Sequence, residues 1–180
     1  SKQDEGRRIT LLFEGIATQS DIYVNGHIIK HNYCGYNPIE VDITDVLEYD
    51  ENAVNVVAVY TNAEAHNGWW YEGGGICRHV WLQKTAPVCA ETYGLYVLPE
   101  KIGDAEWNVS VTASVLNETD TLKTADVSFK LLDGERVIGQ ADESVNIDGY
   151  GKSEGKVSIS VKNPRLWDVC DPYMYGAEVI

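Results

Sequence analysis

Apolar and polar residues alternate with a period of two along almost the whole chain, and this pattern most constrains the fold. β-Branched and aromatic residues fill these alternating runs, and Asn, Asp, Gly and Pro separate one run from the next. The clearest runs in the first half cover residues 9–15, 20–29, 39–44 and 53–61. A half-buried strand requires such alternation, because successive side chains point to opposite faces of a sheet. The sequence therefore predicts antiparallel β-sheets, and it argues against a helix of normal length in the second half.

Turn residues place the hairpins within this pattern. Asn25-Gly26 lies between two apolar runs, and both residue types tolerate the positive φ angles of a two-residue type I′ turn. Asp133-Gly134 predicts a second hairpin of the same kind. Residues 42–54 have room for one short helical turn, which we expect Thr44 or Asp45 to cap.

A break in the alternation divides the chain into two predicted domains. Pro87 interrupts the pattern between two strand runs, so we place a boundary there, with one domain over residues 1–85 and another over 86–180. In the second domain turns recur about every ten to twelve residues, which is the rhythm of a seven-stranded β-sandwich. The sequence predicts two all-β domains in tandem.

Charge and composition exclude several classes of function. The 180 residues carry a net charge of −14 and are 44% hydrophobic, with no basic run anywhere. Nucleic acids and anionic membrane surfaces are therefore poor partners, because binding to them needs Lys and Arg to neutralise phosphates. No apolar run approaches the roughly 18 residues of a membrane span, and no signal peptide opens the chain. The opening residues, SKQDEGRRIT, predict a cut inside a longer protein.

The four cysteines predict a reducing compartment. Their positions are Cys34, Cys77, Cys89 and Cys170, a spacing too wide for a zinc ribbon or a small disulfide-rich domain. We expect four reduced thiols, buried or half-buried in strands. This favours a cytoplasmic location.

The segment GWWYEGGGICRHVWL, residues 68–82, is the most unusual stretch of the sequence. Several kinds of binding or catalytic site have to be considered for it. A phosphate-binding glycine loop needs a helix after it and a Lys-Ser/Thr pair, and this segment has neither. For a metal site, His27, His31 and Cys34 are close in sequence, and so are Cys77 and His79. We interpret these as surface residues near turns rather than as a tetrahedral ligand set. Neither a nucleophile elbow nor an oxyanion hole is indicated.

The carboxylates and aromatic residues of the first half also have two interpretations. Glycosidases use a pair of carboxylates, but most acidic residues here alternate with apolar ones and are expected on the solvated face of a sheet. They are Glu14, Asp21, Glu40, Asp42, Glu64 and Glu72. Trp69, Trp70 and Tyr71 are adjacent, so they cannot all enter one core from a strand. Their rings either contact the C–H face of a sugar or lie wedged between sheets.

Four motifs follow one another in the first half, and they read LLFEGIATQSDIYVNGHII, HNYCGYNPIEVDITDVL, NAVNVVAVYTN and WWYEGGGICRHVWL. In this order they resemble the sugar-binding jelly-roll domain of glycoside hydrolase family 2, the family of β-galactosidases, β-glucuronidases and β-mannosidases. The second half resembles the family's immunoglobulin-like sandwich, and NPRLWDVCDPYMY is similar to the motif that leads into its last strand. The resemblance implies an all-β fold in which a partial jelly-roll sandwich precedes an immunoglobulin-like sandwich.

The resemblance also implies an activity and a set of candidate residues. It implies a retaining hydrolase whose two catalytic carboxyl groups lie in a TIM barrel of about 250 residues, for which these residues have no room. No catalytic residue, metal site or cofactor is therefore expected in this chain, although a metal ion in the barrel stays open. The residues expected to contact substrate are Asn67, Trp69, Trp70, Tyr71 and Glu72, and those expected to shape the loop are Gly73, Gly75 and Arg78.

Within this loop, Trp69 stands where some family members have an acidic residue. That departure favours a stacking or wall role for Trp69, or sugar contact through Asn67 or Glu72. Arg78 is expected to tie the loop to neighbouring backbone with its fork of donors, and Cys77 is expected to pack.

Three hypotheses follow for function. The chain is a non-catalytic N-terminal fragment of a β-galactosidase-like enzyme, an autonomous carbohydrate-binding module, or an adhesin-like or scaffolding pair of sandwiches. The first implies a carbohydrate substrate, the enzyme's own downstream barrel and a possible homo-oligomer as partners.

Overall fold

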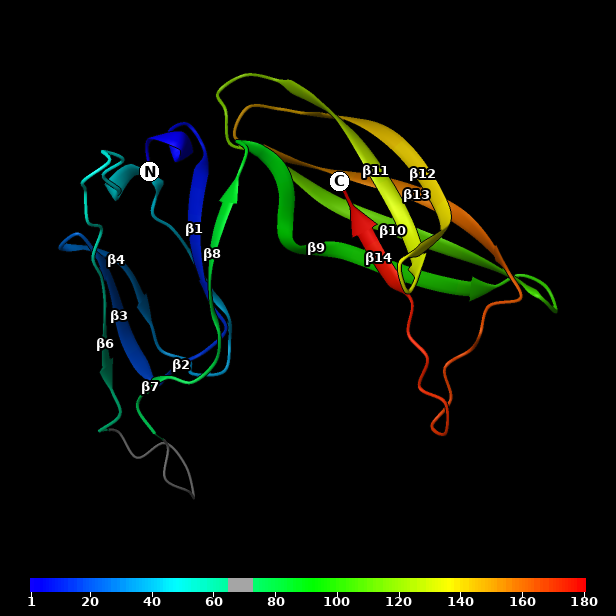
Figure 1. Ribbon diagram of the computed structural model, residues 1–180, viewed down its shortest axis with the longest axis horizontal. Helices are drawn as coiled ribbons and strands as arrows, with labels where there is room; N and C mark the ends of the chain where they lie inside the picture. Colours follow the sequence, from blue (N-terminus) through cyan, green and yellow to red (C-terminus); the bar gives the residue numbers. More distant parts are fainter. Residues whose placement is uncertain (65–72) are drawn as a thin grey trace. The chain divides into compact units, whose positions relative to one another are not determined.

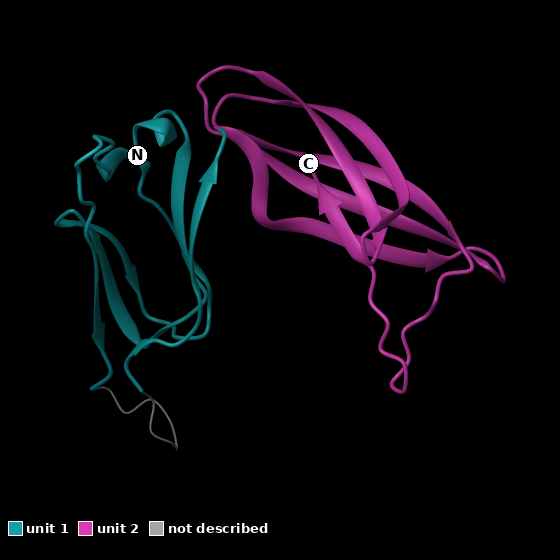
Figure 2. Ribbon diagram, in the orientation of Figure 1, with its two compact units in different colours: residues 1–86 teal, residues 87–180 magenta. Residues whose placement is uncertain are grey.

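The computed structural model describes residues 1–64 and 73–180, which form two compact units (Figure 2). Unit 1 is Ser1–Ala86 and unit 2 is Pro87–Ile180. Nearly all of the regular structure is β-strand, with only two short 3-10 turns, η1 (Lys2–Asp4) and η2 (Thr44–Val46), in the described residues (Figure 1). The all-β prediction is confirmed. Within those described residues, no helix has the length and apolar character needed to cross a membrane.

Unit 1 is built from two three-stranded antiparallel sheets and a short two-stranded ribbon. The first sheet has the order β5-β1-β8, the second β4-β3-β6, and the ribbon pairs β2 with β7. The strands are β1 (Arg8–Phe13), β2 (Ile16–Ala17), β3 (Gln19–Val24), β4 (His27–Asn32), β5 (Ile39–Asp42), β6 (Val57–Asn62), β7 (Gly75–Ile76) and β8 (Val80–Thr85).

The core of unit 1 comes from alternate residues of β1, β3 and β5, as the period of two requires. Its buried members are Ile9, Leu11, Phe13, Ile16, Ile22, Val24, Ile39, Val41 and Ile43. One side of this core is open. Val80 and Leu82 of β8 pair with core residues of β1, yet they are 41% and 56% exposed. Val57 of β6, the cross-strand partner of the buried Val24, is also exposed.

The turns of unit 1 lie where the sequence predicts them, but the residue that caps the helical turn differs from the prediction. Asn25 and Gly26 have φ angles of 50° and 83°, as a type I′ turn between β3 and β4 requires. The expected helical turn is η2, but neither Thr44 nor Asp45 caps it. Asp42 accepts the bonds instead, from the Thr44 backbone N–H at 2.8 Å and from the Thr44 hydroxyl at 2.6 Å.

Unit 2, which is described throughout, is a sandwich of six strands rather than the seven expected. Its sheets have the orders β13-β10-β9 and β12-β11-β14. The strands are β9 (Val88–Lys101), β10 (Glu106–Asn117), β11 (Lys123–Asp133), β12 (Arg136–Ile147), β13 (Gly151–Lys162) and β14 (Gly176–Val179). The count falls by one because β9 continues through a kink at Tyr93, where φ is 58° and the pairing with β10 shifts register.

The predicted hairpin between β11 and β12 is present, with a shifted turn. Asp133 pairs with Arg136, so the two central residues are Gly134 and Glu135 rather than Asp133 and Gly134. Gly134 has a φ of 61°, and glycine at the first central position is the requirement of a type II′ turn.

A buried polar side chain organises one end of unit 2. Asn117 is 1% exposed, and its amide nitrogen donates to the carbonyls of Thr121, Ile147 and Asp148 at 2.8, 3.1 and 3.0 Å. Its amide oxygen accepts from the Thr119 backbone N–H at 3.0 Å. Buried amides need such partners, so Asn117 joins the connection between β10 and β11 to the connection between β12 and β13.

The cysteine prediction is partly wrong. All four cysteines are free, but only Cys89 lies in a strand, and it is half-buried. Cys34 is half-buried in a connection, whereas Cys77 and Cys170 are exposed outside strands.

Candidate functional site

The structure describes the chain to Glu64, just beyond β6, and again from Gly73, just before β7. The candidate residues Asn67, Trp69, Trp70, Tyr71 and Glu72 lie outside the described residues. The described residues on either side of this loop approach each other closely. A Cβ placed on Gly74 would lie 3.1 Å from the Cβ of Ala63, which precedes the segment. The base of the loop is therefore narrow, and only glycine fits at position 74 without a shift of its neighbour.

Three sequence motifs that are far apart along the chain meet at this base. A Cβ on Gly15, from the FEG motif, would lie 3.0 Å from the Gly35 carbonyl oxygen and 3.2 Å from the Cys77 Sγ. Gly35, from the CGY motif, comes equally close to Ala17, with 3.2 Å between a Cβ on Gly35 and the Ala17 Cα. Backbones can approach this closely only where side chains are missing. These two glycines set the separation of the three segments.

Arg78 joins the same segments by hydrogen bonds. Its Nη1 donates to the backbone carbonyls of Glu14 and Tyr36, each at 3.3 Å. The Cys77 backbone N–H donates to the Gly15 carbonyl at 3.1 Å, and β7 pairs with β2 just before it. The guanidinium thus lies against the backbone of two other segments, through its Nη1.

The two glycines named as loop-shaping residues differ in their surroundings. Gly75 has a φ of 126°, a conformation that residues with a side chain rarely adopt, so it allows the chain to turn into β7. A Cβ on Gly73 would meet no described atom within 4 Å. Gly74, which the sequence interpretation passed over, is the glycine of the three that a neighbour approaches closely.

Glu14 makes specific contacts beside this base, although the sequence placed it only on a solvated face. Its Oε1 accepts the Trp81 indole N–H at 2.9 Å, and its Oε2 lies 3.1 Å from the Nδ1 of His79. The indole hydrogen bond, and after it the contact with His79, hold the pKa of the Glu14 carboxyl below its usual range. The His79 and Trp81 rings are 5.6 Å apart, tilted by 32°.

The residues weighed as metal ligands are arranged otherwise. The Nδ1 of His31, on β4, lies 2.5 Å from the Asp21 Oδ1 on the neighbouring strand β3. Within residues 1–64 and 73–180, no three His, Cys, Asp or Glu side chains are grouped so that they could hold a metal ion.

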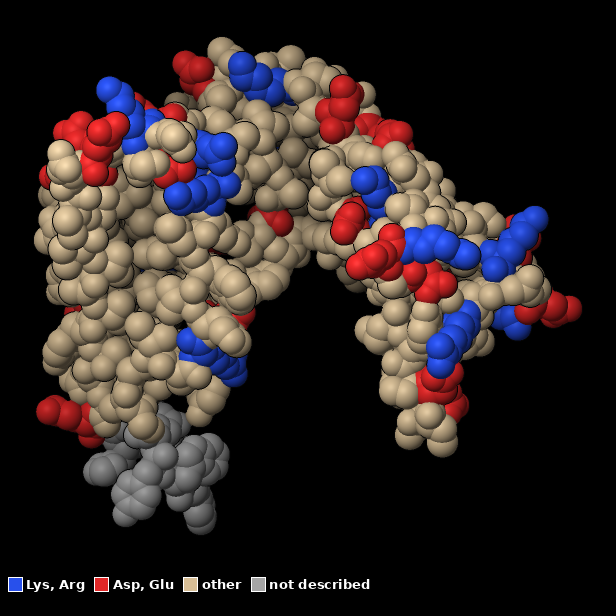
Figure 3. Space-filling view, in the orientation of Figure 1, with Lys and Arg blue, Asp and Glu red and all other residues tan. Residues whose placement is uncertain are grey.

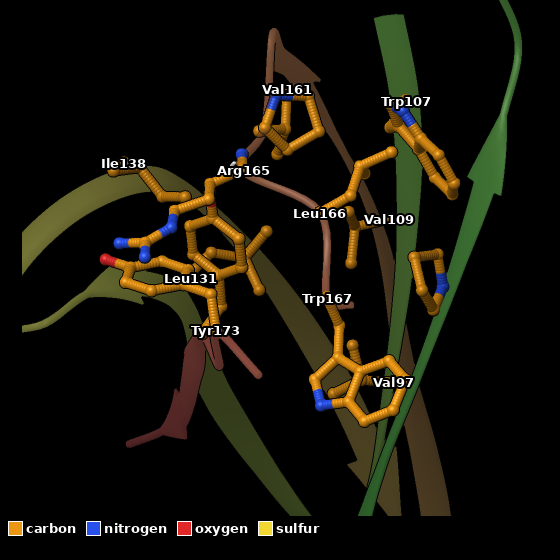
Figure 4. A pocket seen from close by; sticks show the side chains of 13 residues that line it. Val97, Trp107, Val109, Leu131, Ile138, Val161, Arg165, Leu166, Trp167 and Tyr173 are labelled. Atoms are coloured by element: carbon orange, nitrogen blue, oxygen red, sulfur yellow. Dashed lines mark hydrogen bonds between the residues drawn. The ribbon is translucent and has the colours of Figure 1, made fainter. Parts of the chain in front are cut away.

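Unit 2 contains an apolar hollow of about 430 Å³ at one end of its sandwich. Figure 4 shows Trp107, Trp167 and Tyr173 among the side chains around it. The charged group at its wall is Arg165, which pairs with Asp171 and lies 4.1 Å from the centroid of the Tyr173 ring. The hollow therefore presents aromatic and aliphatic surface.

Charged side chains are mixed over the face of the molecule seen in Figure 3. Lys and Arg lie among Asp and Glu there rather than in one basic area. This distribution agrees with the net charge of −14, which disfavours polyanionic partners.

Comparisons with known proteins match both units. The family model for the sugar-binding domain of glycosyl hydrolases family 2 matches residues 1–86, and the model for glycosyl hydrolases family 2 matches residues 93–180. A β-galactosidase (BoGH2A) of Bacteroides ovatus is 32% identical over 97% of this chain and 20% of its own length. A β-glucuronidase of Formosa agariphila is 27% identical, again over 97% of this chain and 20% of its own.

Solved structures agree. A family 2 member from Bacteroides cellulosilyticus superposes with a TM-score of 0.91 at 29% identity, covering 98% of this chain and 24% of that protein. A family 2 β-glucuronidase gives a TM-score of 0.90 at 25% identity, covering 99% of this chain and 21% of that protein. The chain thus spans about one fifth of the length of the first two curated relatives. With both units matched by models of one family, the chain belongs to glycoside hydrolase family 2.

Proposed function

We propose that this chain is the non-catalytic N-terminal part of a family 2 glycosidase and that the complete protein hydrolyses β-galactosidic bonds. The observation that carries the proposal is the junction of three motifs at the narrow base of the loop. A fold that holds both ends of one loop so tightly positions whatever that loop carries. Here the loop carries Asn67, Trp69, Trp70, Tyr71 and Glu72, which we propose to contact the substrate.

In this proposal the chemistry takes place in a downstream barrel and these two units support it. Retaining glycosidases use two carboxyl groups about 5–5.5 Å apart, one as nucleophile and one as acid and base. We place both in the barrel. The role of this chain is then to orient the barrel and to supply one wall of the sugar site, which requires no cofactor in these residues.

A galactoside is a better candidate than a glucuronide on the charge of this region. A glucuronide carries a carboxylate, which calls for a cationic partner when it is taken out of water. Residues 65–72 contain neither Lys nor Arg. The nearby Arg78 already donates to two backbone carbonyls. The relative with the highest identity given above is a β-galactosidase, which supports the same choice.

Activity measurements on the complete protein test this proposal. We expect the product of the whole coding sequence to hydrolyse p-nitrophenyl β-galactoside with a higher kcat/KM than the β-glucuronide. The 180-residue chain alone should hydrolyse neither, because it lacks the carboxyl pair. Turnover by a purified 180-residue sample would contradict the proposal that the catalytic carboxyl groups lie in a downstream barrel. A complete protein that prefers the glucuronide would overturn the choice of sugar.

We also propose that the complete enzyme is a cytoplasmic homo-oligomer. Four free cysteines support the reducing location. Light scattering on the complete protein tests the assembly, and a monomer at working concentration would contradict it.

A further inference from the structure

A second candidate for ligand binding lies on the outer face of the sheet β5-β1-β8, away from the core of unit 1. Leu12 identifies this face. It is 5% exposed, but it does not belong to the core cluster formed by its neighbours Leu11 and Phe13, so its side chain points the other way. Its cross-strand partner on β8 is Trp81. The indole therefore covers Leu12 from outside.

Trp81 is held in place and is still half exposed. Its indole N–H donates to Glu14 at 2.9 Å. The centroids of the His79 and Trp81 rings are 5.6 Å apart. Half of the Trp81 surface nevertheless remains open to solvent, at 50%. A large ring that is oriented by a hydrogen bond and left uncovered is preorganised to meet a flat partner.

Polar groups flank this ring on both sides along the strands. On one side are Glu14 and His79. On the other, the Thr10 hydroxyl donates to the Gln83 side chain at 2.9 Å. His79, which directly precedes β8, and Trp81 and Gln83 of β8 are alternate residues and so share one face, over roughly 13 Å of extended chain. The row is longer than a single sugar ring and combines one apolar plane with acceptors and donors at its ends.

We propose that this row, His79-Trp81-Gln83 with Glu14, binds a neutral oligosaccharide. The Trp81 ring packs against the C–H face of a sugar, and Glu14 accepts hydrogen bonds from its hydroxyls. This contact goes beyond the proposed function, because it lies on the sheet and not in the loop. It also gives the chain a binding activity of its own.

Charge decides between neutral and acidic glycans. Glu14 is a carboxylate at the edge of the indole, and the chain as a whole has a net charge of −14. A uronic acid brought to this face would meet like charge, which disfavours binding. Galactan and other uncharged chains avoid that repulsion. We therefore expect neutral glycans to bind and polygalacturonate not to bind.

Binding to the 180-residue chain tests the proposal directly. We would record the indole N–H signals of the 15N-labelled chain during titration with β-1,4-galactotetraose and, separately, with tetragalacturonate. The Trp81 signal, assigned from its loss in Trp81→Phe, should shift with galactotetraose alone. The Trp167 signal is the internal control, because Trp167 is also exposed but lies in unit 2. No shift at Trp81 with galactotetraose would overturn the proposal.

Variants separate a binding role from a structural one. Trp81→Phe keeps a ring over Leu12 but removes the indole, and it should weaken galactan retention in affinity electrophoresis about tenfold. Trp167→Phe is the matched control and should leave retention unchanged. If Trp81→Phe lowers the melting temperature yet retains galactan like the unmodified chain, the row is structural and the proposal is wrong. Hydrolysis by the complete protein is a separate measurement, so this proposal and the proposed function fail independently.

Discussion

Unit 1 and unit 2 are both β-sandwiches, but different features stabilise them. Unit 2 has long strands of eleven to fourteen residues in five of its six elements, around a core that includes the fully buried Phe129. Unit 1 has strands of at most six residues, close backbone approaches at Gly15 and Gly35, and an open side at β8. The shorter, glycine-dependent unit is also the one that carries the candidate site. The difference teaches that the site region is held by specific backbone contacts more than by buried area.

The largest expected effect compares the two cores directly. Phe13 and Phe129 are each almost fully buried, at 1% and 0% exposed. Replacing either with Ala should cost about 3–5 kcal/mol of unfolding free energy, because the ring leaves a cavity. In scanning calorimetry, Phe129→Ala should lower the transition of unit 2 and Phe13→Ala that of unit 1. A single transition lowered equally by both variants would show that the units unfold together, against the comparison.

Asn117 is the next strongest test, because it is the most deeply buried polar side chain of unit 2. Asn117→Ala removes donors from three carbonyls and an acceptor from Thr119. Since unsatisfied buried groups are costly, we expect a loss of about 3 kcal/mol. Urea denaturation measures it, with the exposed Asn146→Ala as the control of the same residue type. A loss no larger than in that control would mean that water replaces the amide.

Arg78 provides the corresponding polar contact in unit 1, and a smaller effect is expected there. Both hydrogen bonds come from one guanidinium nitrogen, Nη1, and Arg78→Lys shortens the side chain so that its ammonium no longer reaches both the Glu14 and the Tyr36 carbonyl. We expect about 1 kcal/mol of lost stability and faster amide exchange at Cys77. Arg165→Lys in unit 2 serves as the control and should leave Cys77 exchange unchanged. Unchanged amide exchange at Cys77 in Arg78→Lys would show that Arg78 does not stabilise the base of the loop.

The smallest expected effect is a pH dependence of unit 1. The pKa of Glu14 is lowered by the Trp81 hydrogen bond, from an ordinary value of 4.5. A depressed folded pKa gives stability that is present above 4.5 and is lost as the pH falls through the folded value. Melting temperatures of unit 1 measured from pH 6 downward should therefore fall less steeply in Glu14→Gln. Parallel curves for the two proteins would argue against a specific role of the carboxylate.

Asp4 contributes to the same pH window and needs its own control. The hydrogen bond from Lys84 is the largest of the effects that lower its pKa from 3.8 to about 2. Its contribution is present above 3.8 and disappears as the pH falls toward 2. The variant Asp4→Asn separates this loss from that of Glu14.

Local sequence patterns correctly predicted those turns whose structure depends only on neighbouring residues. Asn25-Gly26 gave the hairpin of β3 and β4, because the turn and its flanking strands are adjacent in sequence. The extra length of β9 was missed because Tyr93 takes a left-handed φ without the usual turn residues around it. The cap of η2 was misassigned because Asp42, the last residue of β5, reaches forward into the turn.

The candidate site shows the limit of that reasoning more sharply. Alternation places Glu14 and Trp81 each on one face of a strand, but they are 67 residues apart, and only the pairing of β1 with β8 brings them together. That pairing depends on the whole sandwich and cannot be obtained from either strand alone. The five candidate contacts at 67 and 69–72 stay predictions. The family resemblance, by contrast, depends on short motifs in a fixed order, so the sequence alone sufficed for it.

The narrow base at Ala63 and Gly74 has a consequence for how such proteins diversify. Because Gly74 lies close to Ala63, and Arg78 bonds the chain just after β7 to two other segments, the residues between Ala63 and Gly74 can change in length or chemistry with little strain passed to the sheets. The loop sequence can then vary while the sheets that hold it keep the same structure. Replacement of the residues between Ala63 and Gly74 would then leave the sandwich that carries them the same.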